Sequence, residues 1–167
     1  ANSNGDGKGC GRVVEVEAPE ADAGIATLAI PTLAHDFHAS LASTEWVLLV
    51  YLLTLASMVT VIGRVADMAG RKLLYVYGFA VFTAASMLCG LAPTLAVLLG
   101  ARVVQAAGAA MLQANSVALI VNAVPAARLA RAIGVQGAAQ ALGLAVGPVV
   151  GGLLIGLGGW RWIFFVN

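Results

Sequence analysis

Residues 46–63 read WVLLVYLLTLASMVTVIG, a run of 18 residues without a charged side chain. Two longer stretches share this property, because residues 73–101 and residues 132–160 are each free of charge for 29 residues. The hydrocarbon core of a bilayer is about 30 Å thick, and about 20 residues of α-helix are enough to cross it. Each stretch therefore predicts a helix that spans a membrane.

The composition of the whole chain points the same way. Of the 167 residues, 60% are hydrophobic and 10% are charged, and the mean hydropathy is +0.93. Soluble domains contain about 45–50% apolar and about 25% charged residues. The formal net charge is only +1, so no electrostatic field favours a nucleic acid. These values exclude an ordinary soluble domain and a nucleic-acid binder, and they make the lipid bilayer the expected surroundings.

The breaks between the apolar runs divide the chain into an all-α, polytopic membrane helix bundle. Backbone groups in lipid must be satisfied internally, and these runs lack the alternation that barrel strands show. We expect four full spanning helices. A truncated first helix precedes them, and the start of a sixth helix follows them. The expected segments are 23–34, then 46–65, 73–92, 95–123 and 132–157, and finally residues from 162 onward.

Basic residues in the breaks predict the orientation. They gather in alternate breaks, and cytoplasmic loops are enriched in such residues. The basic residues of these two breaks are Arg64, Arg71, Lys72, Arg128 and Arg131. We therefore expect a multi-pass protein of the plasma (inner) membrane with a cytoplasmic N-terminus.

Residues 1–21 differ from the rest of the chain. The first 22 residues contain seven of the 17 charged side chains, and they include no apolar run of the kind that a secretory signal needs. We expect residues 1–21 to be poorly ordered in water, because their composition does not offset the entropy of ordering.

Three short motifs occur along the chain in the same order as in one known family. The first is Gly63-x-x-x-Asp67-x-x-Gly70-Arg71-Lys72, the second is Arg102-x-x-Gln105, and the third runs from Gly143 through Gly147-Pro148 to Gly151-Gly152. Together they resemble the major facilitator superfamily, and the Gly147-Pro148 pair is similar to that of its drug–proton antiporters. Two further stretches resemble the 14-helix branch of those antiporters: Asp22-x-x-Ile25-x-x-x-Ala29-x-Pro31 and Trp46-x-x-x-x-Tyr51-x-Leu53.

The resemblance implies a function for the whole transporter, of which residues 22–167 would be an incomplete N-terminal bundle. That function is efflux of amphiphilic or cationic small molecules in exchange for protons. The resemblance implies no enzymatic step and no cofactor beyond the proton gradient. It also implies that the chain needs the C-terminal half of the transporter as a partner. By the same resemblance, Arg102 assists proton movement, the loop at 63–72 stabilises one side of the access cycle, and the glycines of the third motif form a sliding surface.

Asp22 and Arg102 occupy matching depths. Asp22 lies nine residues before Pro31, and Arg102 lies nine residues after Pro93. At 1.5 Å per residue each charge is about 13–14 Å deep, near the midplane. A lone charge there is costly, so we expect the two side chains to form a pair that a proton can break. In the alternatives, Arg102 snorkels to the outer surface and Asp22 only caps a short helix.

Glycines and carboxamides suggest packing and a cavity. Gly63 and Gly70 favour close helix approach and a tight loop, and Gly143, Gly147 and Gly151 share one helix face that Pro148 should bend. Several polar side chains in the spans are candidates for lining an aqueous cavity. These are Tyr51, Gln105, Gln113, Gln136 and Gln140.

Other interpretations remain open. His35 and His38 have only Asp36 and Glu45 nearby, so we expect a solvated loop and no metal site. The chain could also belong to a nutrient uptake symporter of the same fold. A further alternative is a truncated membrane remnant that does not transport.

Overall fold

The computed structural model describes residues 29–166, and every regular element in that range is helical. Residues 29–36 are helical and precede four long helices and one short one. These are α2 (Leu41–Ala69), α3 (Arg71–Gly90), α4 (Leu95–Ala123), α5 (Ala126–Gly158) and α6 (Arg161–Val166). The all-α class is confirmed. The expectations for residues 1–21 and for 23–28 lie outside the described residues.

Three helix boundaries differ from expectation by four or more residues, and one of them is the end of α2, which lies at Ala69 and not near 65. α2 begins at Leu41 and not near 46, because the Ser40 hydroxyl accepts a hydrogen bond from the Ser43 N–H at 3.1 Å. α5 begins at Ala126 and not near 132, directly after Pro125, so its first turns contain two arginines. An apolar run indicates only the part of a helix that spans lipid. It therefore does not predict the more polar first turns of α2 and α5.

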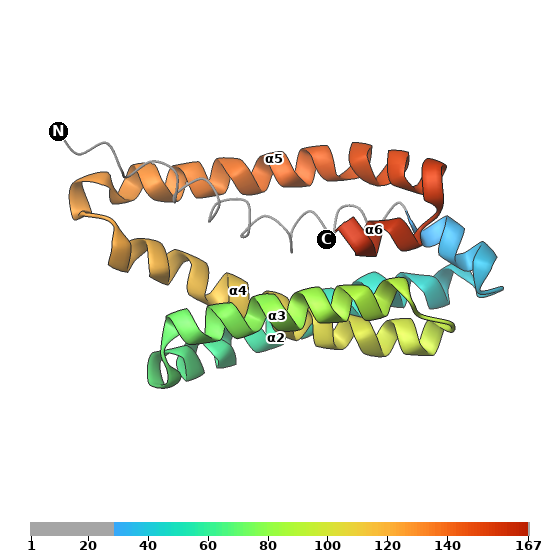
Figure 1. Cartoon of the computed structure of the whole chain (residues 1–167), viewed down its shortest axis with the longest axis horizontal. Coiled ribbons are helices and arrows are strands. Elements are labelled where there is room, and N and C mark those ends of the chain that lie inside the picture. Colours follow the sequence, from blue (N-terminus) through green and yellow to red (C-terminus); the bar gives the residue numbers. More distant parts are fainter. Residues whose placement is uncertain (1–28, 167) are drawn as a thin grey trace.

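The helices form two groups (Figure 1). α2, α3 and α4 pack side by side, and α5 runs along the opposite side with α6 beside it. α4 begins within the first group and ends near the start of α5, so it connects the two. The α2–α3 and α4–α5 turns lie at one end of the molecule, and the remaining turns lie at the other (Figure 1). The two breaks that carry most of the basic residues therefore share one end.

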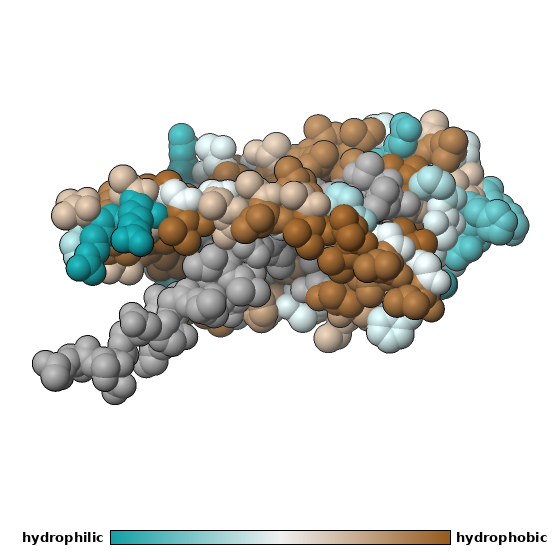
Figure 2. Space-filling view, turned by 90° about the horizontal axis from the view of Figure 1, so that it is seen from above, coloured by the Kyte–Doolittle hydropathy of each residue, from teal (hydrophilic) through white to brown (hydrophobic). Residues whose placement is uncertain are grey.

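The surface fits a bilayer. Each of the four long helices is long and apolar enough to cross a membrane. Large apolar side chains stay exposed along them, for example Leu53, Val76 and Leu153 at 62% each. Figure 2 shows hydrophobic residues between more hydrophilic ends. Exposed apolar surface on this scale in a helical bundle indicates a lipid-facing surface.

The closest helix contact joins α3 and α4 at two glycines. A Cβ on Gly108 would lie 2.6 Å from the Phe82 backbone nitrogen, and a Cβ on Gly78 would lie 2.6 Å from the Met111 Cβ. Small residues let two backbones approach in this way. The close approach expected at Gly63 is wrong, because nothing lies within 4 Å of a Cβ built there.

Trp160 joins the two groups of helices at the other end of the bundle. Its buried indole donates a hydrogen bond from Nε1 to Asp36 Oδ2 at 2.8 Å. The ring also packs against Phe37 and Phe164, with centroids 5.4 Å and 6.0 Å away. The segment before α2 is thereby fastened to the α5–α6 turn.

Trp160→Phe should lower the stability of this junction by about 1–2 kcal/mol, because a hydrogen bond to a charged group is lost while an aromatic ring is kept. Trp162→Phe is the matched control, since Trp162 is 52% exposed. Thermal unfolding of both variants in detergent measures the difference. Equal transition temperatures would show that the Trp160–Asp36 bond contributes nothing.

Candidate functional site

Arg102 lies at the centre of a buried polar network between α3 and α4. The side chain is fully buried, and its Nη1 donates to Gln105 Oε1 at 2.8 Å one turn along α4. Gln105 Nε2 in turn donates to Ser86 Oγ of α3 at 2.7 Å. The Cys89 thiol approaches the same Gln105 oxygen at 3.7 Å. This chain of hydrogen bonds fixes the guanidinium inside the bundle.

Two aromatic rings enclose the guanidinium. Its Cζ lies 5.0 Å from the centroid of the Tyr51 ring of α2 and 4.9 Å from that of the Phe164 ring of α6. Cation–π contacts within about 6 Å are favourable, and more so away from water. The alternative in which Arg102 snorkels to the outer surface is therefore wrong.

The predicted partner of Arg102 is not among the described residues. Asp22 precedes residue 29, so the Asp22–Arg102 pair stays a prediction. What the structure establishes is one half of that prediction, a charged side chain buried in a span. A buried charge of this kind requires compensating groups, and Gln105 with the two rings supplies part of that compensation.

The 63–72 motif forms the turn between α2 and α3. Arg71 donates from Nη2 and Nε to Asp67 Oδ1 at 2.7 and 3.1 Å, an i,i+4 ion pair on the exposed surface. Gly70 has φ +97°, a backbone conformation that side chains disfavour, so the tight turn does need glycine there. Lys72 is exposed beside it.

The third motif lies on α5. The helix is continuous through Pro148, and Gly147 and Gly151 are buried while Gly143 is half-buried. Gly152 is exposed, with nothing within 4 Å of a Cβ built on it. Most other positions of α5 are exposed, which leaves a long apolar face available for lipid or protein.

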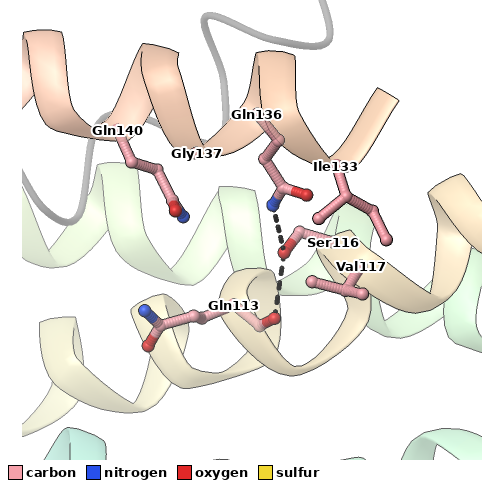
Figure 3. A pocket seen from close by; sticks show the side chains of 7 residues that line it. All are labelled: Gln113, Ser116, Val117, Ile133, Gln136, Gly137 and Gln140. Atoms are coloured by element: carbon pink, nitrogen blue, oxygen red, sulfur yellow. Dashed lines mark hydrogen bonds between the residues drawn. The ribbon is translucent and has the colours of Figure 1, made fainter. Parts of the chain in front are cut away.

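A cavity of about 260 Å³ lies between α4 and α5 (Figure 3). Three predicted cavity residues, Gln113, Gln136 and Gln140, line it together with Ser116, Val117, Ile133 and Gly137. Gln136 Nε2 donates to Ser116 Oγ at 3.1 Å, which joins the two helices. The other two predicted cavity residues, Tyr51 and Gln105, do not line it and belong to the Arg102 network.

Sequence reasoning missed Ser86 and Phe164 of the network, and the Trp160–Asp36 bond. A serine within an apolar span was the available signal for Ser86, since buried hydroxyls need a partner. Residues 29–166 contain no group of three or more His, Cys, Asp or Glu side chains that could hold a metal ion.

Known proteins place the chain in a family. The model of the Major Facilitator Superfamily matches residues 21–167. Riboflavin transporter RibZ of Clostridioides difficile (strain 630) is 36% identical over 146 residues, which are 87% of this chain and 32% of RibZ. Multidrug resistance protein Stp of Mycobacterium tuberculosis (strain ATCC 25618 / H37Rv) is 41% identical over 147 residues, 87% of this chain and 27% of Stp.

Methylenomycin A resistance protein of Streptomyces coelicolor (strain ATCC BAA-471 / A3(2) / M145) is 37% identical over 147 residues, 87% of this chain and 31% of that protein. The chain spans about a third or less of the length of these relatives. They are named for transport and resistance, not for catalysis. With its helices long enough to cross a membrane, this multi-pass membrane chain belongs to the Major Facilitator Superfamily.

Proposed function

We propose that the chain is part of a proton-driven exporter of amphiphilic or cationic small molecules. The single observation that carries the proposal is Arg102, buried within a spanning helix and held by Gln105 and two rings. An arginine at that depth costs about 2.5–3.5 kcal/mol on insertion scales, and such residues mark ion and proton pathways.

The proposed energy source is the proton gradient, with no other cofactor. A proton that reaches the carboxylate paired with Arg102 removes one charge of the pair and weakens the hold between two helices. We assign this carboxylate to Asp22. Loss of the proton on the other side of the membrane restores the pair, so one cycle of protonation alternates between two helix arrangements.

The other motifs have supporting roles in the proposal. The Gly70 turn with its Asp67–Arg71 ion pair would stabilise one arrangement at the cytoplasmic end. The glycine face of α5 would slide against the C-terminal half of the transporter, which is the proposed protein partner. We assign the protein to the plasma membrane with a cytoplasmic N-terminus, on the basic residues that share one end of the bundle.

Resistance proteins among the relatives support export, and two of those described carry names of that kind. RibZ, a riboflavin transporter, favours a second candidate, uptake of a nutrient by symport. The Gly147-Pro148-x-x-Gly151-Gly152 stretch argues for export, since it resembles that of the antiporters. A remnant that does not transport is the third possibility.

A chimera tests the proposal, with residues 21–167 replacing the matched segment of Stp. Cells that make the chimera should accumulate less ethidium, a cationic amphiphile, than cells without it, and a protonophore should remove the difference. Stp itself and membrane localisation of the chimera are the controls. Increased accumulation would support uptake, and no change with a correctly inserted chimera would support the remnant.

The 167-residue chain by itself should not transport. Alternating access requires two bundles that move around a central site, and four long spans cannot supply both. Liposomes that contain this chain alone should retain ethidium as well as protein-free liposomes. Proton-dependent release from them would contradict this expectation.

A further inference from the structure

Ser86 of α3 is connected to Arg102 through a single carboxamide. Its hydroxyl accepts a hydrogen bond from Gln105 Nε2 at 2.7 Å, and Gln105 Oε1 accepts one from Arg102 Nη1 at 2.8 Å. A guanidinium can only donate, so the carboxamide oxygen must face Arg102 and the carboxamide nitrogen must face Ser86. Each end of the carboxamide therefore has its own partner, and the two partners lie on different helices.

The Ser86 hydroxyl has no substitute among the described residues. Gln105 is fully buried and Ser86 is 1% exposed, so the bond between them is shielded from bulk water. Within residues 29–166, Ser86 Oγ is the one acceptor that Gln105 Nε2 contacts. The Cys89 thiol lies 3.7 Å from the other end of the carboxamide, where it is a weak donor. Without the hydroxyl, a buried N–H would lose its acceptor, and the carboxamide would have to turn to find another.

Gln105 determines the direction of the guanidinium. The rings of Tyr51 and Phe164 lie 5.0 Å and 4.9 Å from Arg102 Cζ, and they attract its charge as a whole without fixing a single N–H. A hydrogen bond weakens steeply as it departs from a straight line, so the bond to Gln105 does fix one N–H. If the carboxamide turned, Arg102 would keep its two rings and lose its orientation.

Ser86 lies on a tightly packed part of α3. Phe82 is one turn earlier on the same face, and its backbone nitrogen would lie 2.6 Å from a Cβ built on Gly108 of α4. The two helices therefore have little freedom to move apart or rotate near Ser86. A functional side chain is held precisely when its supporting hydrogen bonds come from a rigid element of this kind.

We propose that Ser86 is a positioning residue for Arg102, which it holds through Gln105 in the direction that the proton-coupled pair uses. Ser86 itself contacts neither the proton nor the substrate. Its effect on coupling rests on the proposed function, because that effect requires Arg102 to re-form its carboxylate pair in each cycle. Its effect on the orientation of Arg102 does not depend on transport, so the two effects are measured separately.

The first measurement is hydrogen exchange of the Arg102 guanidinium. The 167-residue chain is prepared with isotope-labelled arginine in lipid nanodiscs and transferred to heavy water, and NMR follows the signal that is absent from Arg102→Gln. Ser86→Ala should make this signal exchange about tenfold faster, which is the effect expected from the loss of one buried hydrogen bond. Unchanged exchange would overturn the proposal.

Two further variants separate positioning from stability. Ser116→Ala removes another buried serine that accepts from a carboxamide, that of Gln136, at 3.1 Å. Ser116 lies about 21 Å along α4 from Arg102 at 1.5 Å per residue, so its loss should leave the Arg102 exchange unchanged. Equal acceleration in Ser116→Ala would indicate a general loosening of the bundle and would overturn the proposal. Ser86→Cys keeps a weak acceptor of similar shape, and it should still accelerate exchange if the alanine variant fails to insert.

The second measurement is transport in the chimera. Ser86→Ala should lower ethidium export driven by a pH gradient about tenfold, whereas Ser57→Ala, which removes an exposed hydroxyl of α2, should not. In a Gln105→Leu background, Ser86→Ala should have no further effect, because the contact through which it acts is gone. A further loss there, or unchanged export in Ser86→Ala alone, would contradict the effect on coupling. If the unmodified chimera does not export, the proposed function fails, and the Arg102 exchange still decides whether Ser86 positions Arg102.

Discussion

Asp22→Asn should abolish proton coupling in the chimera that carries residues 21–167, while the protein still folds and inserts. The asparagine keeps the size of the side chain but cannot bind and release a proton. Arg102 would keep its bonds to Gln105 and its two rings, so the network that the structure describes would remain. Efflux of ethidium should then no longer respond to an imposed pH gradient.

Glu45→Gln is the matched control, because it also removes a carboxylate but at an exposed position of α2. It should leave the coupling unchanged. A double variant, Asp22→Asn with Arg102→Gln, tests the pair itself. If the two side chains interact, the stability cost of the double variant should be smaller than the sum of the two single costs. Additive costs, or coupling that survives Asp22→Asn, would contradict the predicted pair.

Gly108→Ala should cause the largest loss of stability of any single methyl group added to the described residues of α4. The new Cβ would meet the Phe82 backbone at 2.6 and 2.9 Å and the Gly78 carbonyl oxygen at 3.0 Å. Backbone atoms cannot move aside as the end of a side chain can, so α3 and α4 must separate. Overpacking costs about 1–3 kcal/mol, and we expect the upper end of that range here.

Gly100→Ala makes the same chemical change on the same helix, where nothing lies within 4 Å of the added Cβ. Alanine has the better helix propensity, so this control should be neutral or slightly stabilising. Thermal unfolding in detergent compares the two variants. A Gly108→Ala protein as stable as Gly100→Ala would show that α3 and α4 are not in close contact there.

Most of the fold could be predicted from the sequence, since the apolar runs needed no knowledge of neighbours. All four long helices contain the expected runs, and the errors are at their ends. Ser40 precedes α2, and the first turns of α5 contain two arginines, so at these two places the helix begins before the apolar run does. Which helices touch could not be predicted from the same pattern. Gly63 and Gly108 both lie inside long apolar helices, yet only Gly108 lies against the backbone of a neighbouring helix.

The candidate site was predictable only where one residue carries the signal. Arg102 is conspicuous because a charge in a span is rare and costly. Ser86 and Phe164 come from other helices, and their positions around Arg102 depend on packing that no local spacing encodes. Two glutamines of α4 that were both expected to line a cavity have different surroundings: Gln105 contacts Arg102, and Gln113 lines the cavity beside α5.

The most direct measurement follows protons and substrate together. The chimera is reconstituted into liposomes loaded with ethidium and with a pH-sensitive dye whose emission is separate from that of ethidium. Protein molecules that are oriented to release ethidium should acidify the lumen as ethidium leaves, because antiport moves protons inward while the substrate moves outward. Release without a change in lumen pH, or with a rise in pH, would contradict proton antiport.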